Sequence, residues 1–153
     1  MKLADLIRQP EFASPAQEAV LNTIATASWV SGELAAALAP HGITLAQYNV
    51  LRILRGAHPG PHTCSEVGHR LVDRTPDVTR LLDRLERMGL VARCRAAHDR
   101  RVVEVSITEA GLALLAGLDA PVEAALERLA RHLGPRELRT LSALLEKLRT
   151  DQA

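Results

Sequence analysis

The sequence predicts a mainly α-helical fold with one small β-hairpin, and three observations support this class. The chain is rich in leucine, alanine and arginine, which favour helices, whereas aromatic residues supply only 2% of its 153 residues. Residues that start helices precede most of the stretches whose apolar residues recur at helical spacing. Two extended segments, 90–94 and the Val- and Ile-rich 101–107, lie close together in the chain. No linker interrupts this pattern, so we expect a single domain over 1–153.

The first long helix is expected over residues 14–39. Ser14-Pro15-Ala16-Gln17 combines an N-cap serine, a proline at the first helical position and a glutamine three residues after the serine. These residues satisfy or avoid the free N–H groups of a helix start. Apolar residues then recur from Val20 to Leu38, and Pro40 with Gly42 is expected to end the helix.

The middle of the chain, 44–108, is expected to hold three shorter helices and the hairpin. Thr44-x-x-Gln47 and Thr63-x-x-Glu66 are capping boxes that open the first two of these helices. Thr75-Pro76 is expected to cap the third helix, at about 75–88, which ends at Gly89. The buried stripe of this third helix is expected to comprise Val78, Leu81, Leu82, Leu85 and Met88. The hairpin follows at about 92–107.

Two more helices are expected after the hairpin. Thr108 is expected to cap the first, which bends at Pro121 because proline cannot donate the intrahelical hydrogen bond. Gly134-Pro135 separates it from the last helix. The two flanking segments, 14–39 and 109–150, carry wide apolar faces. They are therefore candidates for a dimer interface with two-fold symmetry.

A helix, a tight turn, a second helix and a hairpin with arginines at its tip form the outline of a winged helix-turn-helix. In that module the second helix enters the major groove of DNA, and the hairpin can reach an adjacent groove. The apolar stripe of the 75–88 helix must face the core, which leaves its polar residues outward. We therefore predict that this helix contacts bases and phosphates through Thr75, Asp77, Thr79, Arg80 and Arg84. A charged, solvated helix face is the alternative for these residues.

Basic charge is concentrated in the predicted hairpin. The chain has a net charge of +1, yet between residues 87 and 101 five arginines stand against one aspartate. Such charge beside a predicted recognition helix suits the phosphate backbone of DNA. Arg95, Arg100 and Arg101 are therefore predicted DNA contacts, with solvated surface charge as the alternative.

The run DVTRLLDRLERMGLV, followed by HDRRVVEVSITEAG, resembles the MarR (multiple antibiotic resistance regulator) family of transcription factors. The family pattern is matched in register by Thr79, Leu85-Glu86, Gly89-Leu90-Val91, Asp99-Arg100-Arg101 and Ile107-Thr108-x-x-Gly111. The resemblance covers most of the chain from Thr44 to Leu115. It implies a homodimer, built by the terminal helices, on a pseudo-palindromic operator in double-stranded DNA. It also implies that Arg101 enters the minor groove and that Asp99 orients Arg101 through a salt bridge.

The resemblance further implies release from DNA by a small aromatic or lipophilic anion. In the family such effectors bind between the dimer helices and the DNA-binding lobe. Trp29 and Tyr48 are candidates to line that pocket, with His41 or Arg52 as a polar contact. The alternative, favoured by the scarcity of aromatic residues, is that Trp29 and Tyr48 are core or interface residues.

Thiol and metal sensing are two further possibilities. Cys64 lies near the start of a helix, where the helix dipole increases the reactivity of a thiol, so it is a candidate redox sensor. Peroxide-sensing members of the family, however, carry their cysteine near the N-terminus, where this chain has none. His62, Cys64 and His69 do not have a standard zinc spacing, so neither a metal site nor a cofactor is predicted.

Other functional classes fit the sequence less well. We find no nucleophile elbow, phosphate-binding loop, dinucleotide fingerprint or zinc-protease motif, so catalysis is not expected. A signal peptide and a membrane-length apolar run are also missing from the sequence, which predicts a cytoplasmic protein. The prediction is a dimeric DNA-binding repressor. A winged-helix dimer that binds a protein in place of DNA is the alternative.

Overall fold

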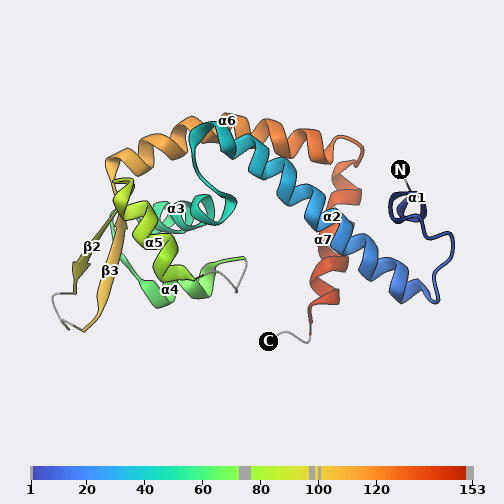
Figure 1. Cartoon of the computed structure of the whole chain (residues 1–153), viewed down its shortest axis with the longest axis horizontal. Helices are drawn as coiled ribbons and strands as arrows, with labels where there is room; N and C mark the ends of the chain where they lie inside the picture. Colours follow the sequence, from blue (N-terminus) through green and yellow to red (C-terminus); the bar gives the residue numbers. More distant parts are fainter. Residues whose placement is uncertain (1, 73–76, 97–98, 100, 151–153) are drawn as a thin grey trace.

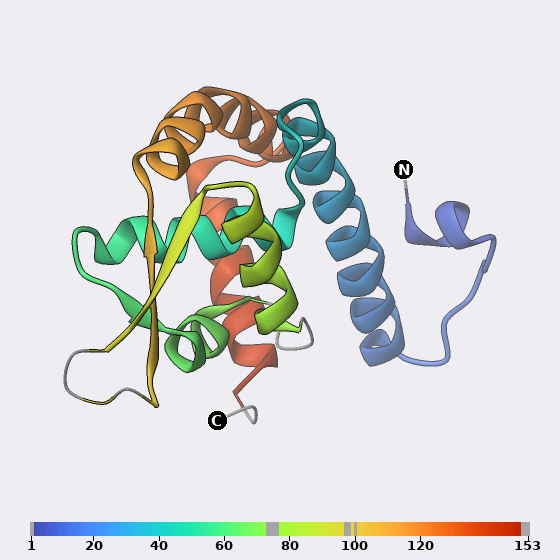
Figure 2. The same cartoon turned by 60° about the vertical axis from the view of Figure 1, so that its left-hand side comes forward.

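A computed structural model gives the fold of the protein and describes residues 2–72, 77–96, 99 and 101–150. The long helices α2 (Pro15–Leu38) and α6 (Glu109–Ala130) pack against each other and form an arch, with α7 (Pro135–Leu148) descending from its far end (Figure 1). A separate lobe lies under the other end of α6. This lobe contains α3 (Leu45–Ala57), α4 (Cys64–Arg70), α5 (Val78–Arg87) and a small sheet, and its elements lie close together in both views (Figure 2).

The sheet is antiparallel and joins the hairpin to the start of α4. Its strands are β1 (His62–Thr63), β2 (Val91–Arg95) and β3 (Val103–Ile107), in the order β1-β3-β2. Val105 of β3 is fully buried and is paired with Arg93 on one side and with His62 on the other. The mainly helical fold with a hairpin wing that the sequence predicts is therefore confirmed.

One hydrophobic core holds the lobe to α6. Leu51 and Leu54 of α3, Leu82 and Leu85 of α5, and Leu115 of α6 are each no more than 1% exposed within it. The helix starts follow the predicted caps: the Ser14, Thr44, Thr63 and Thr108 hydroxyls each accept a backbone N–H three residues later. The buried leucines of α3 and α6 thus hold α5 in place.

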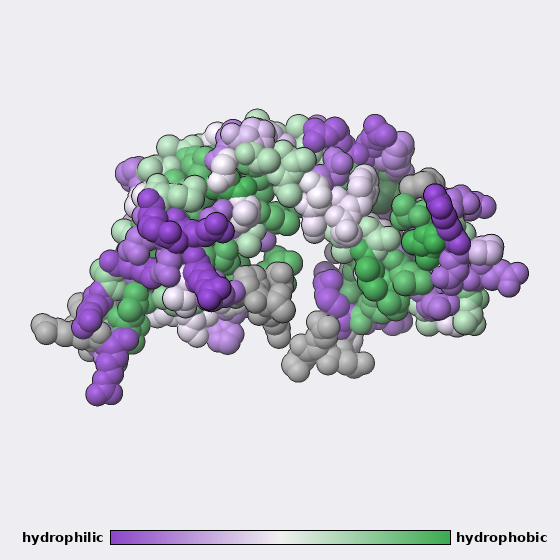
Figure 3. Space-filling view, viewed as in Figure 1, coloured by the Kyte–Doolittle hydropathy of each residue, from purple (hydrophilic) through white to green (hydrophobic). Residues whose placement is uncertain are grey.

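The flanking helices bury little within the chain. Only Leu38 is buried along the 24 residues of α2, and none of the 14 residues of α7 is buried. Hydrophobic residues gather on the visible surface where α1 (Leu3–Ile7), α2 and α7 lie, at the right of the view (Figure 3). Among the described residues, no helix is both long and apolar enough to cross a membrane.

A tight clasp joins the base of the wing to the first turn of α6. The Thr108 hydroxyl donates to the Gly89 carbonyl (2.7 Å), while the Thr108 backbone N–H donates to the Leu90 carbonyl (3.1 Å). Gly111 lies so close that a Cβ atom there would be 2.4 Å from the Leu90 oxygen and 2.7 Å from Ile107 Cγ1. The clasp explains why a threonine and a glycine three residues apart follow the last wing strand.

Several details differ from the sequence prediction. Helix α2 ends at Leu38 and continues as a short 3₁₀ turn, Ala39–His41, before Gly42 adopts a left-handed conformation (φ 72°). Helix α5 begins at Val78, three residues later than expected, because Asp77 is its N-cap. Met88 is 44% exposed and does not belong to the buried stripe, since the helix has ended one residue earlier. Helix α1 and strand β1 were not predicted, whereas α6 runs on through Pro121 as one curved helix (Figure 1).

Candidate nucleic-acid interface

Helix α5 is fixed at both of its ends. At the start, Asp77 Oδ1 accepts the backbone N–H of Arg80 (3.2 Å). At the end, the Leu90 N–H donates to the Leu85 carbonyl (3.0 Å) and the Gly89 N–H donates to the Glu86 carbonyl (2.9 Å). This pair of bonds, with Gly89 at φ 72°, is a Schellman motif. The helix is therefore held as a short rod of ten residues.

The predicted contact residues of α5 lie on its exposed side. Thr79, Arg80 and Arg84 are exposed, and Leu82 and Leu85 on the other side are fully buried. Arg80 Nε lies 3.1 Å from Asp77 Oδ2, but the Arg80 side chain is 86% exposed and free to turn to a phosphate. Asp77 is an N-cap and an ion-pair partner of Arg80, and its predicted contact with DNA stays a prediction. Thr75 lies outside the described residues.

Hydrophilic residues predominate on the visible surface around α5 and towards the tip of the wing, with a hydrophobic patch between them (Figure 3). Arg95 at the end of β2 and Arg101 at the far side of the wing are both exposed. Asp99 Oδ1 accepts the backbone N–H of Arg101 (2.9 Å), so it positions Arg101 through the main chain. No ion pair joins these two side chains, both of which lie among the described residues. Arg100 lies outside them.

Arg93 is one of the five arginines between residues 87 and 101, but its side chain does not face solvent. Its side chain is 19% exposed and forms ion pairs with Asp83 and Glu86 of α5. The free basic charge of the wing is therefore lower by one arginine than the sequence indicates. The role of Arg93 is visible only from its contacts with α5, an element that lies up to fourteen residues earlier in the sequence.

The start of α4, which supports α5, contains one carboxyl with a shifted pKa. Glu66 Oε2 accepts the Thr63 backbone N–H (2.7 Å) and the Thr63 hydroxyl (2.9 Å). These bonds hold the pKa of Glu66 below its usual 4.5, the backbone bond having the larger effect, and the charges of His62 and Arg70 act in the same direction. Arg70 donates to His62 Nε2 (2.9 Å), which ties the end of α4 back to β1.

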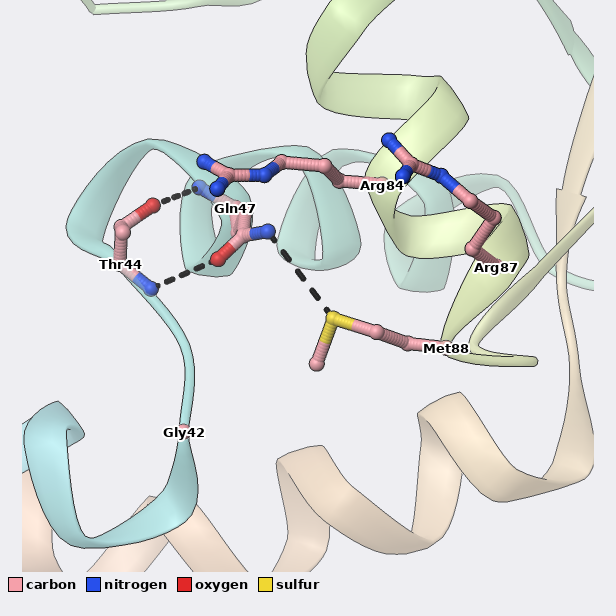
Figure 4. Close-up of a pocket in the computed structure, with 6 residues that line it drawn as sticks. All are labelled: Gly42, Thr44, Gln47, Arg84, Arg87 and Met88. Carbon is pink, nitrogen blue, oxygen red and sulfur yellow. Dashed lines mark hydrogen bonds between the residues drawn. The ribbon is translucent and has the colours of Figure 1, made fainter.

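A cavity of about 350 Å³ lies beside α5, opposite the first turn of α3. Arg84 reaches from α5 across to the first turn of α3, and Met88 Sδ lies 4.0 Å from Gln47 Nε2 (Figure 4). Gln47 is 5% exposed, and its side-chain oxygen accepts the Thr44 backbone N–H (2.9 Å). The cavity therefore has a polar floor on α3 and a basic wall on α5.

The four residues proposed to bind an effector are spread over separate surroundings. Tyr48 is buried in the lobe core, with the Arg52 guanidinium carbon 5.8 Å from its ring centre. Arg52 lines a small cavity between α3 and the end of α4, whereas Trp29 lines a different, largely apolar cavity between α1 and α2. His41 is exposed on the 3₁₀ turn. The alternative that Tyr48 is a core residue agrees with its burial.

Cys64 is half-buried at the first position of α4 and lines an open cavity with His69, Val78 and Thr79. Both cysteines are free, and Cys94 is exposed on β2. Within the described ranges, no three His, Cys, Asp or Glu side chains cluster closely enough to hold a metal ion.

Comparison with known proteins agrees with this architecture. A sequence model of the MarR family matches residues 41–102. A transcriptional repressor of Mycobacterium tuberculosis is 34% identical over 78% of this chain and 84% of its own length. The homoprotocatechuate degradative operon repressor of Escherichia coli is 29% identical over 70% of this chain and 71% of its own.

Solved structures give the same result. A MarR transcription factor from Planctomyces limnophilus has a TM-score of 0.70 and 40% identity, covering 89% of this chain and 98% of its own. A mutant MarR of Escherichia coli in complex with operator DNA has a TM-score of 0.75 and 32% identity, covering 82% and 89% of the two chains. With its helix-turn-helix lobe, its hairpin wing and these relatives, the chain belongs to the MarR family of winged-helix transcriptional regulators.

Proposed function

We propose that this protein is a transcriptional repressor that binds a pseudo-palindromic operator as a homodimer. One observation carries the DNA-binding part of the proposal: Thr79, Arg80 and Arg84 share the exposed side of α5 next to the arginines of the wing. A short helix with polar residues on its open side fits the major groove, and exposed arginines on an adjoining hairpin fit the phosphate backbone or the minor groove. Repression is proposed because the two relatives named above are transcriptional repressors.

We also propose which segments of the chain bind DNA and which form the dimer. We assign DNA binding to 44–108 and dimerisation to 14–39 and 109–150. The support is the contrast in burial, because the lobe shares a continuous core with α6 while α2 and α7 leave apolar side chains exposed. These comprise Val20, Ile24, Trp29, Leu138, Leu141, Leu144 and Leu148. Contiguous exposed apolar faces are typical of protein–protein interaction sites.

Specific DNA binding is tested by fluorescence anisotropy with labelled duplex from upstream of the protein's own gene. The titration is run at two salt concentrations against unrelated competitor DNA. We expect saturable binding that survives the competitor and weakens steeply with salt, because displaced counterions accompany each phosphate contact.

The variant Arg101→Ala distinguishes DNA binding from the protein-binding alternative. We expect its affinity for the duplex to fall roughly tenfold or more, with the dimer intact, because a groove-inserted arginine is lost. Arg136→Ala, an exposed arginine on α7, is the matched control and should bind as the unchanged protein does. Equal affinity of Arg101→Ala and the unchanged protein would favour a winged-helix dimer that binds a protein.

Release by a small aromatic or lipophilic anion is the regulatory part of the proposal. The support is an apolar cavity of about 380 Å³ beside Trp29 and a smaller cavity beside Arg52. The same anisotropy assay, with benzoate added to the preformed complex, tests it. Release that is lost in Trp29→Ala or in Arg52→Ala would locate the effector in one cavity or the other. The thiol alternative is tested by adding peroxide to the same complex, and release that is lost in Cys64→Ser would support it.

A further inference from the structure

Arg93 occupies the middle of β2 but turns its side chain towards α5. It is paired with the buried Val105 of β3, at the centre of the sheet. Arg95, two residues later on the same strand, is exposed. Two arginines of one strand thus have different surroundings, and only Arg95 is available to a ligand in solution.

The Arg93 guanidinium group contacts α5 at three points over two turns of the helix. Nη1 lies 2.6 Å from Asp83 Oδ1, and Nη2 donates to the Thr79 backbone carbonyl (3.2 Å). Nε lies 3.7 Å from Glu86 Oε2 and is buried without a hydrogen-bond partner of its own. All five N–H groups of a guanidinium lie in one plane, so three contacts of this kind define the orientation of the helix surface that they touch.

The clasp at Thr108 fixes the end of α5 at Gly89, but the remaining contacts along the length of the helix are less directional. Leu82 and Leu85 bury its inner side, but apolar contacts allow small rotations and shifts at little cost. A recognition helix reads base edges only if its outward side chains are placed to within a fraction of an ångström. Arg93 supplies the directional contact that the leucines lack.

We propose that Arg93 is a positioning residue: it fixes the rotation and depth of α5 relative to the wing and so determines sequence discrimination without touching DNA. This inference rests on the DNA-binding function proposed above. Asp83 and Glu86 are the partners of Arg93 in this role, and their carboxylates are directed at β2 instead of repelling phosphates. A role as a phosphate contact would require Arg93 to leave two carboxylates that partly enclose it.

The test compares Arg93→Met with Arg95→Met, which remove the same charge from the same strand. The first readout is binding to the preferred duplex and to an unrelated duplex over a range of salt. The second is amide hydrogen exchange across α5 in the protein without DNA, which reports the attachment of the helix directly.

For Arg93→Met we expect the preference for the specific duplex to fall roughly tenfold. The affinity for the unrelated duplex and the slope of log affinity against log salt concentration should not change. Exchange of the α5 amides should become roughly tenfold faster. For Arg95→Met we expect weaker binding to both duplexes, a salt slope smaller by about one, and unchanged exchange. The double variant Asp83→Asn/Arg93→Met should lose little more preference for the specific duplex than Arg93→Met alone, because both changes break the same contact.

Two results would overturn the proposal. One is a salt slope for Arg93→Met that falls as it does for Arg95→Met, which makes Arg93 a phosphate contact. The other is unchanged exchange in α5. If the unchanged protein prefers no duplex, the proposed function fails, while exchange still decides whether Arg93 holds α5. Should Arg93→Met not fold, Asp83→Asn alone provides the same two readouts.

Discussion

Glu66 shows how one side chain stabilises the helix that supports α5. It completes a capping box with Thr63, and its carboxylate accepts two hydrogen bonds from that residue. Because these bonds favour the ionised form, the folded-state pKa of Glu66 lies below 4.5. A depressed carboxyl pKa adds stability above the unfolded pKa, and this contribution is lost as the pH falls through the folded pKa.

Glu66→Gln should therefore lower the free energy of unfolding by an amount that depends on pH. Glutamine keeps the acceptor but loses the charge, so we expect the difference from the unchanged protein to be constant above about pH 4.5 and to shrink at lower pH. Urea unfolding at a series of pH values measures it. Glu127→Gln, at an exposed position of α6, serves as the control. A difference that stays constant at the lowest pH at which both proteins fold would contradict the assignment.

At the scale of single residues, local patterns were predictable and distant partners were not. The caps at Ser14, Thr44, Thr63 and Thr108 follow from residues three or four positions apart, and all were confirmed. The role of Arg93 depends on α5, which only the folded chain brings beside β2. Charge counted along the sequence could not distinguish this arginine from its exposed neighbours.

At the scale of elements, the clasp between the wing and α6 depends on the absence of a side chain at Gly111. Gly111→Ala would place a Cβ atom 2.4 Å from a backbone oxygen, which can move only if α6 and β2 separate. We expect this change to cost about 1–3 kcal/mol of unfolding free energy, as overpacking does. Gly117→Ala in the same helix has open space around the new atom, and should be neutral or stabilising by about 0.5–1 kcal/mol. Urea denaturation of the two variants compares them, and equal stabilities would argue against the clasp.

Element boundaries reveal where sequence signals compete. Thr75-Pro76 and Asp77 are all favourable at helix starts, and the structure places the N-cap at Asp77. Strand β1 has only two residues and exists through its pairing with β3, so no local periodicity could predict it. Helix α1 has five residues, of which Leu3 alone is buried, too few for a helical pattern. Long elements with caps were predicted well, and short ones held by tertiary contacts were not.

At the scale of the whole molecule, the exposed apolar face of α7 suggests how two chains associate. Leu141 is 43% exposed and Leu144 is 59% exposed, and Leu138 and Leu148 continue the same face. We expect Leu144→Glu to shift the protein towards the monomer, because a carboxylate would be buried unpaired in the interface. Sedimentation equilibrium over a range of protein concentrations measures the shift.

Ala143→Glu provides the matched control, because Ala143 is exposed on the opposite side of α7 at 3.6 residues per turn. It introduces the same charge and should leave association unchanged. Equal association of both variants would place the interface elsewhere. Loss of operator binding in Leu144→Glu alone would also link dimerisation to recognition of paired half-sites.

Because the clasp at Thr108 joins α6 to the base of the wing, the length of α6 fixes how far the wing lies from the far end of that helix. Its 22 residues, about 33 Å of helix, begin at the base of the wing and end where α7 turns away. In a dimer joined through the terminal helices, the separation of the two wings is then set by the length and curvature of this one element. One added turn would move each wing by about 5.4 Å, more than the step of about 3.4 Å between base pairs. A protein altered in this way would read the same bases on a differently spaced pair of half-sites.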